Sequence, residues 1–154
     1  MKIPDRKVLA VDPGEKRIGV AVSDDSGTIA TPLLTFKHKQ RLIDAKKIVE
    51  LAIEHRVFLI IIGQSFYADG TPNPSGRKSA RLAEVIKSIT DIPVLLWDED
   101  GSTQVARMSR KDLGIKRSRK NSHFDEIAAT VILQSFLDSG QMNKTLDEDG
   151  EKDG

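Results

Sequence analysis

The chain of 154 residues has no cysteine, few aromatic residues and no long apolar segment. Without cysteine it forms neither disulfides nor thiolate metal sites, so any bound metal would be a hard cation held by oxygen or imidazole. Aromatic residues make up 5% of the chain, which argues against a surface that stacks single-stranded bases. No apolar run approaches the roughly 20 residues of a membrane span, and the charged N-terminus lacks the apolar core of a signal peptide. We therefore expect a cytoplasmic protein with no membrane contact.

The formal net charge of +1 conceals an uneven distribution of charge. Residues 141–154 carry five acids and two lysines, a charge of −3, which leaves +4 for residues 1–140. The acidic segment is also poor in apolar residues, a composition typical of disorder. Because the length suits one domain with one substantial core, we expect a domain over residues 1–140 and a disordered acidic tail over residues 141–154.

Residues 8–31 carry the pattern of a three-strand antiparallel meander. An apolar run ends in Asp12 and a tight Pro-Gly turn, and two further extended runs follow. Pro32 cannot donate to a ladder, so the third strand, residues 28–35, belongs at an edge of the sheet. An acid that ends a buried strand just before a Pro-Gly turn lies at a sheet edge that a ligand can approach.

The remaining pattern alternates between helices and strands. The unbroken apolar run of residues 57–62 is typical of a central parallel strand covered on both faces. The other expected segments are a helix over residues 39–56, a loop over 64–76, a helix around 82–89, a short strand over 93–97, and helices over 102–112 and 122–138. The sequence therefore predicts an α/β fold, with five mixed strands in one sheet and helices packed on it.

Two of these helices have an apolar stripe that predicts the face packed on the sheet. In the helix over residues 39–56 the stripe consists of Leu42, Ala45, Val49, Ala52 and Ile53. In the last helix it consists of Phe124, Ile127, Ala128, Val131 and Ile132.

Acidic residues stand at the ends of three of these elements: Asp12, the cluster Asp98-Glu99-Asp100, and Asp125 in the first turn of the last helix. If the first, fourth and fifth strands are parallel neighbours, the first two groups emerge at one edge of the sheet. Clustered carboxylates repel unless a cation joins them, and two Mg²⁺ or Mn²⁺ ions roughly 3.5–4 Å apart can activate a water and stabilise a leaving oxygen. This arrangement suggests phosphodiester hydrolysis.

Each acid also has a purely structural interpretation. Asp12 could initiate the turn by accepting bonds from backbone amides, and the acidic cluster could be a solvated connection. Asp125 lies three residues after Ser122, so the pair fits a capping box. Together the three acids fit one metal site better than three coincidences.

Basic residues gather in one segment. Residues 107–120 hold seven cations and one acid. Such runs are commonly solvated faces, but this one lies between two elements expected to carry metal ligands, which favours contact with a polyanion. Phosphate contacts supply affinity and little sequence choice. With two cations of the first hairpin, the expected nucleic-acid-binding residues are Lys16, Arg17, Arg107, Arg110, Lys111, Lys116, Arg117, Arg119 and Lys120.

Several motifs taken in order resemble the YqgF/RuvX family of small bacterial RNase H-like proteins over residues 7–139. They are VDPGEKRIGVAVSD, GTIATPL, IIGQSFYADGT, WDEDGSTQVA and FDEIAATVILQSFLD. The resemblance implies an RNase H-like fold and a nuclease of the 5′ end of precursor 16S ribosomal RNA or, by older analogy, of Holliday junctions. By motif, Asp12 matches the acid of the family's first strand, Glu99 the glutamate of its Asp-Glu-Arg segment, and Asp125 the acid heading its last helix.

These matches predict catalytic and metal-binding roles for Asp12, Glu99 and Asp125, with two Mg²⁺ or Mn²⁺ ions. The expected partner is nucleic acid, RNA ahead of DNA, within ribosomal precursor particles. A junction resolvase would act as a symmetric dimer, whereas an RNA-processing enzyme could act as a monomer.

The chain departs from the family pattern at two places. Asp100 replaces the usual arginine, a change of two charge units that either adds a ligand or removes a phosphate contact. Gly63-Gln64-Ser65 replaces the usual Gly-Leu-Pro. Which of the three consecutive acids share a face of the sheet is also open. A strand that continued through Asp100 would put Asp98 and Asp100 on one face and Glu99 on the other.

Two alternatives come from other functional classes. A nucleotide-binding relative of the sugar-kinase and actin-like fold could cradle phosphates with an Asp-x-Gly hairpin, although that fold usually needs two such domains and this chain has room for one. A catalytically silent RNA-binding or assembly protein would bind RNA equally with and without Mg²⁺ and would not cleave it.

Overall fold

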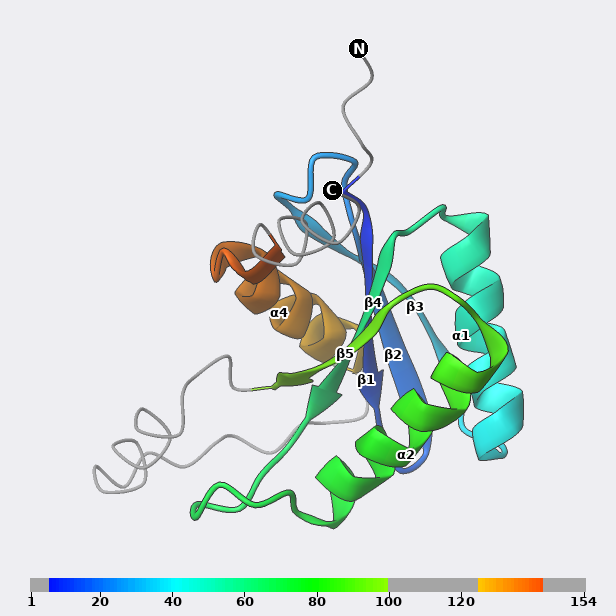
Figure 1. The fold of residues 1–154 in the computed structure, drawn as a ribbon, viewed down its shortest axis with the longest axis vertical. Coiled ribbons are helices and arrows are strands. Elements are labelled where there is room, and N and C mark those ends of the chain that lie inside the picture. Colours follow the sequence, from blue (N-terminus) through cyan, green and yellow to red (C-terminus); the bar gives the residue numbers. More distant parts are fainter. Residues whose placement is uncertain (1–5, 100–124, 143–154) are drawn as a thin grey trace, which may run out of the picture.

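The computed structural model describes residues 6–99 and 125–142, with the side chains of Asp125 and Glu126 excepted. Its strands form one five-stranded sheet in the order β3-β2-β1-β4-β5 (Figure 1). The elements are β1 (Val8–Pro13), β2 (Arg17–Ser23), β3 (Ala30–Lys37), α1 (Arg41–Glu54), β4 (Leu59–Gln64), α2 (Pro74–Ile89), β5 (Val94–Asp98) and α4 (Asp125–Asp138).

The sheet is mixed, as the sequence predicts. Strands β1, β2 and β3 form an antiparallel meander, and β4 pairs in parallel with β1 and with β5. Strand β3, which contains Pro32, lies at an edge. The α/β fold with an antiparallel meander and parallel strands is therefore confirmed.

Some predicted segments have different bounds or lie outside the described residues. Helix α2 begins at Pro74, inside the expected loop, because Asn73 caps it through a 2.8 Å bond from the Gly76 N–H and proline suits the first helical position. The expected helix over residues 102–112 and the basic segment 107–120 lie outside the described residues. So does most of the expected tail, residues 143–154, whereas Met142 is buried.

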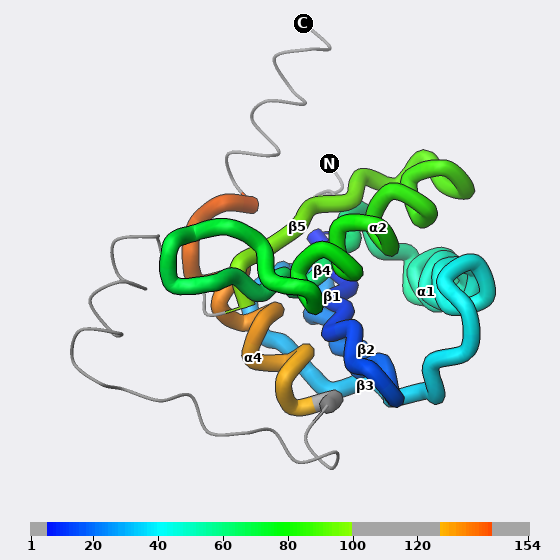
Figure 2. Tube along the Cα trace, turned by 90° about the horizontal axis from the view of Figure 1, so that it is seen from below, coloured from blue at the N-terminus to red at the C-terminus, as the bar shows by residue number. Residues whose placement is uncertain are grey.

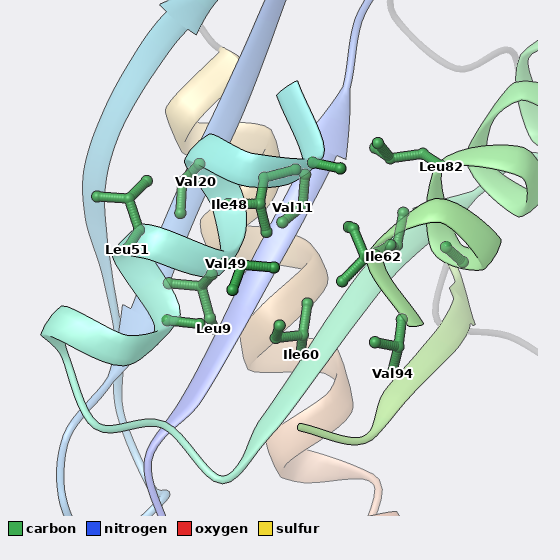
Figure 3. Close-up of a cluster of buried hydrophobic side chains, with 14 of the residues drawn as sticks. Leu9, Val11, Val20, Ile48, Val49, Leu51, Ile60, Ile62, Leu82 and Val94 are labelled. Atoms are coloured by element: carbon green, nitrogen blue, oxygen red, sulfur yellow. The ribbon is translucent and has the colours of Figure 1, made fainter. Parts of the chain in front are cut away.

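Helices cover both faces of the sheet. Helices α1 and α2 lie side by side on one face and α4 lies on the other (Figure 2). On the α1–α2 side, alternate residues of β1 and β4, such as Leu9, Val11, Ile60 and Ile62, pack into one apolar cluster (Figure 3). The residues between them, including Ala10, pack against α4. Because both faces of the central strands are covered, their sequences are unbroken apolar runs.

The predicted faces of α1 and α4 were partly wrong. Leu42 and Ile53 of α1 are 48% and 63% exposed, and Ile127 and Val131 of α4 are 45% and 59% exposed. The buried stripe of α4 instead consists of Ala129, Ile132, Leu133 and Phe136. Apolar residues surround most of the circumference of α4, so periodicity alone does not define one face, and packing on the sheet selects it.

The C-terminal half of α4 is hydrogen-bonded to the β2–β3 connection. Gln134 accepts a bond from the Ala30 N–H and donates one to the Thr28 carbonyl, both 2.9 Å. The Met142 side chain packs against Gly27. Because this connection lies at the end of the sheet where β1 starts, the N-terminal half of α4 extends toward the end where β1 and β4 finish (Figure 1).

Asp24 holds the β2–β3 connection together. Its carboxylate accepts bonds from the Thr28 and Ile29 N–H groups at 2.8 and 3.0 Å and from the Ser26 hydroxyl at 2.5 Å. These hydrogen bonds lower the pKa of Asp24 to about 2, and the bond from the Ile29 N–H has the largest effect. Since the folded-state pKa is depressed from 3.8, this carboxylate stabilises the fold above that pH, and the stabilisation is lost as pH falls through about 2.

We therefore expect Asp24→Asn to lower Tm at pH 7, because the amide offers one acceptor oxygen in place of two. The difference in Tm from wild type should narrow as the pH falls from 4 to 2. Thermal unfolding followed by circular dichroism across this range tests the expectation, with Asp25→Asn as the neighbouring control. A constant difference across the range would contradict it.

None of the helices in the described part of the chain has the length and apolar character needed to cross a membrane.

Candidate active site

Asp12 lies at the end of β1 and is 7% exposed. It follows Val8 and Ala10 in the alternation of β1, and both of those side chains pack on the α4 side of the sheet. Asp12 therefore belongs to the α4 face. The turn that follows is tight: the Gly14 N–H donates to the Arg17 carbonyl at 2.9 Å. A Cβ at Gly14 would collide with that carbonyl, so glycine is needed here.

Glu99 continues the edge strand beyond β5. Its N–H donates to the Gln64 carbonyl at 3.1 Å. Two residues earlier, Trp97 faces α4, where its ring meets Phe136 edge-on with centroids 5.2 Å apart and its Nε1 donates to Ser135 at 3.2 Å. By strand alternation Asp98, the last residue of β5, takes the face opposite to Trp97. Continued one residue past the end of β5, the same alternation predicts that Glu99 lies on the face of Asp12.

Gly63 of β4 stands between these two acids in the sheet. It pairs with Trp97 of β5, and it follows Ile62, the partner of Val11 in β1, so it lies beside Asp12. A Cβ at Gly63 would lie 2.7 Å from the Ile132 Cδ1 atom of α4. The missing side chain therefore lets α4 approach the sheet closely at the level of Asp12.

Asp125 is the first residue of α4, at the end of the helix that extends toward this edge. Its side chain lies outside the described part of the chain. Among the described side chains, no group of three histidines or acids is close enough together to hold a metal ion.

The predicted basic residues divide into two groups. Lys16 and Arg17 are exposed in the first hairpin, next to the turn that follows Asp12. Arg17 lies directly opposite Lys37 in the β2–β3 ladder, and like charges in that position destabilise a sheet unless an anion neutralises them. The other seven predicted cations, those of residues 107–120, and Asp100 lie outside the described residues.

A buried aspartate and the histidine that contacts it were missed by sequence reasoning. Asp44 is 2% exposed; its carboxylate contacts Nδ1 of His38 and accepts a 3.1 Å bond from the Lys39 N–H. The signal was available, because Asp44 precedes the buried Ile48 by four residues and so falls on the buried stripe of α1. A charge at such a position requires a partner.

The described elements define an RNase H-like fold. RuvC of T. thermophilus, solved in complex with a Holliday junction substrate, superposes with a TM-score of 0.53 and 19% identity over 88% of this chain and 95% of that one. At this identity the likeness is one of fold.

The chain belongs to the RuvX family, whose model, described as Holliday junction resolvase, matches residues 6–139. A protein of Thermoanaerobacter pseudethanolicus named "Putative pre-16S rRNA nuclease" is 39% identical over 90% of this chain and 99% of its own length. A protein of the same name from Caldanaerobacter subterraneus is 37% identical over 86% and 96%. These matches confirm the family resemblance seen in the motifs.

Proposed function

We propose that this protein is a metal-dependent nuclease that hydrolyses phosphodiester bonds of nucleic acid, with Asp12, Glu99 and Asp125 as its catalytic, metal-binding carboxylates. The observation that carries the proposal is that β1 and β5 end at the same carboxyl edge of the sheet, with Asp12 on the α4 face and Glu99 directly after β5. Helix α4, which begins with Asp125, extends toward the same edge (Figure 1).

The donor set suits Mg²⁺ or Mn²⁺, because all three side chains offer carboxylate oxygen and hard cations prefer such ligands. Like charges on one face repel each other, and a cation between them removes the repulsion. When bound, a pair of such ions supplies an activated water and neutralises the leaving oxygen.

The chain itself supplies rigidity and strand binding. Asp12 is held on a buried central strand, and Glu99 is held by its bond to Gln64. Rigid placement of reacting groups accounts for a large part of catalysis. Lys16 and Arg17 would hold the phosphate backbone beside the cleaved bond, together with the cations of residues 107–120.

We propose the 5′ end of precursor 16S ribosomal RNA as the substrate, within ribosomal precursor particles in the cytoplasm. The names of the curated relatives support this assignment. A four-way DNA junction is the second candidate, which the description of the family model favours. It would require a symmetric dimer that cuts two strands, whereas the RNA reaction needs one copy.

Adjacent acids on opposite faces provide a sharp test. We expect Glu99→Gln to reduce Mg²⁺-dependent cleavage by about 100-fold or more, and Asp98→Asn to leave it within about fivefold of wild type. The assay compares structured precursor RNA, single-stranded RNA and a four-way DNA junction, each with Mg²⁺ and with Mn²⁺. The substrate class that is cut identifies the function.

Three results would contradict the proposal. Full activity of Glu99→Gln would remove this residue from the mechanism. Equal losses in both variants would show that the face of the strand does not matter. No cleavage of any substrate, with salt-sensitive RNA binding retained in the absence of Mg²⁺, would establish the silent RNA-binding protein instead.

A further inference from the structure

A pocket of about 390 Å³ opens beside the turn that follows Asp12, on the side of the sheet opposite α4. This volume lies within the range of small-ligand sites, roughly 300–1,000 Å³. Its walls come from the first hairpin and from the N-terminal ends of α1 and α2. The pocket shares the Pro13-Gly14 turn with the candidate active site, so the two sites are neighbours without overlapping.

The pocket has an apolar floor and a basic rim. Ile18 and Leu82 line it and are almost fully buried, at 2% and 4% exposure. Arg41 and Lys78 also line it and are exposed. An apolar surface beside cationic groups suits a ligand that has both a ring system and a negative charge.

The acids in the pocket leave these two cations available. The Asp44 carboxylate is occupied by Nδ1 of His38 and by the Lys39 N–H. Within residues 6–99 and 125–142, neither Arg41 nor Lys78 forms an ion pair. Glu15 is the other acid of the lining, on the exposed tip of the hairpin.

Cations connect the pocket to the candidate active site. Lys16, Arg17 and Lys37 are exposed on the first hairpin and on the strand beside it. The Lys16 carbonyl accepts the His38 N–H at 2.9 Å, which joins the hairpin to the wall of the pocket. A polyanion that follows these charges would pass from the pocket to the edge where Asp12 lies.

We propose that this pocket binds one nucleotide, with its phosphate on Arg41 and Lys78 and its nucleoside on Ile18 and Leu82. Arginine and lysine are the usual phosphate ligands, and a nucleoside supplies the apolar rings that the floor accommodates. The proposal rests on the proposed nuclease function, because the bound nucleotide would belong to the substrate strand next to the cleaved bond. A free nucleotide has the same chemistry and would compete for the site.

The test is a titration of the full chain, followed by amide NMR, in EDTA so that no cleavage occurs. The probes are adenosine 5′-monophosphate, adenosine, inorganic phosphate and a ten-nucleotide RNA with a 5′-hydroxyl. We expect the decamer or the monophosphate to shift the amides of Gly14, Arg41 and Ser75, and adenosine alone to leave them unchanged. Shifts with the decamer alone identify a strand subsite, and shifts with the monophosphate as well show that free nucleotide competes.

Matched double variants make the assignment specific. Arg41→Ala combined with Lys78→Ala should weaken binding by about tenfold or more for the probe that shifts the pocket amides, either the decamer or the monophosphate. Lys47→Ala with Arg81→Ala removes one lysine and one arginine from exposed positions of the same two helices outside the pocket. This control should keep the affinity within about twofold of wild type.

Three outcomes would overturn the proposal. These are no shift of the pocket amides with any probe, equal losses in the two double variants, and inorganic phosphate binding as tightly as the nucleotide. Because the titration requires no cleavage, loss of the pocket and loss of the nuclease function are distinguishable. In the cleavage assay, the pocket variant should raise KM and leave kcat unchanged.

Discussion

Replacing Asp12 with asparagine should reduce metal-dependent cleavage by about 1,000-fold or more while the fold and the binding of nucleic acid persist. Asp12 lies on the central strand of the sheet and is buried, so its carboxylate is held in a fixed position. Asparagine has the same shape but no charge, and a neutral amide oxygen is a much weaker ligand for a hard cation. Binding should persist because the variant loses a negative charge beside a phosphate.

The measurement combines single-turnover cleavage with a binding assay and a thermal melt in EDTA. Tm should fall by no more than about 3 °C, because the substitution preserves volume at a buried position. Asp25→Asn is the control, since it removes the same charge from an exposed position and should leave cleavage unchanged. Undiminished cleavage by Asp12→Asn would remove Asp12 from the mechanism.

Gly76→Ala should lower the stability of the fold more than Asp24→Asn or Asp12→Asn. Gly76 is buried in the first turn of α2, and a Cβ there would overlap the backbone carbonyl oxygen of Ser65. The adjacent groups are fixed, because the Gln64 side chain donates to the Gly76 carbonyl at 3.1 Å and Ser65 donates to Asn73 at 2.7 Å. The backbone must therefore move.

Alanine is normally better than glycine in a helix by about 1 kcal/mol, so the overlap works against a favourable propensity. We expect the energetic cost of the overlap to exceed the gain in helix propensity. The net loss in the free energy of unfolding should be about 2–4 kcal/mol, which lowers Tm by about 5–15 °C. Because Gln64 also accepts the Glu99 N–H, cleavage should fall too. Urea unfolding measures the loss of stability.

Ser75→Ala is the matched control for this substitution. Ser75 is exposed in the same turn of α2, and its replacement should change stability by no more than about 0.5 kcal/mol. If Gly76→Ala were as stable as wild type, the tight junction between β4 and α2 would not contribute to the fold as described.

Much of the architecture follows from local patterns in the chain. The unbroken apolar run that became β4 indicates a strand covered on both faces, and Pro32 indicates an edge strand; both expectations are confirmed. Asp12 stands out because a charge at the end of a buried strand requires an explanation. These features depend on neighbouring residues and on the period of the strand, so the sequence suffices to find them.

Other features depend on contacts between distant segments. The face that α4 turns to the sheet could not be predicted, because Ile127 and Val131 are as apolar as the residues that are buried in their place. Gly63 and the Gln134 bonds to the β2–β3 connection decide how α4 lies. In the same way, the sequence shows that Asp44 is a charged residue on the buried face of α1, but it does not identify His38 as the partner of Asp44.

The mixed α/β sheet, the family and the acids at the strand ends could all be predicted from the sequence, because apolar periodicity and motif order are properties of the chain alone. The pairing of β4 with β5 had to be seen in the structure: it puts Asp98 on the face away from Asp12, and the bond from the Glu99 N–H to the Gln64 carbonyl continues the ladder by one residue. The tertiary structure also decided that Arg41 and Lys78 meet around one pocket, because residues on two helices become neighbours only when both pack on the same sheet.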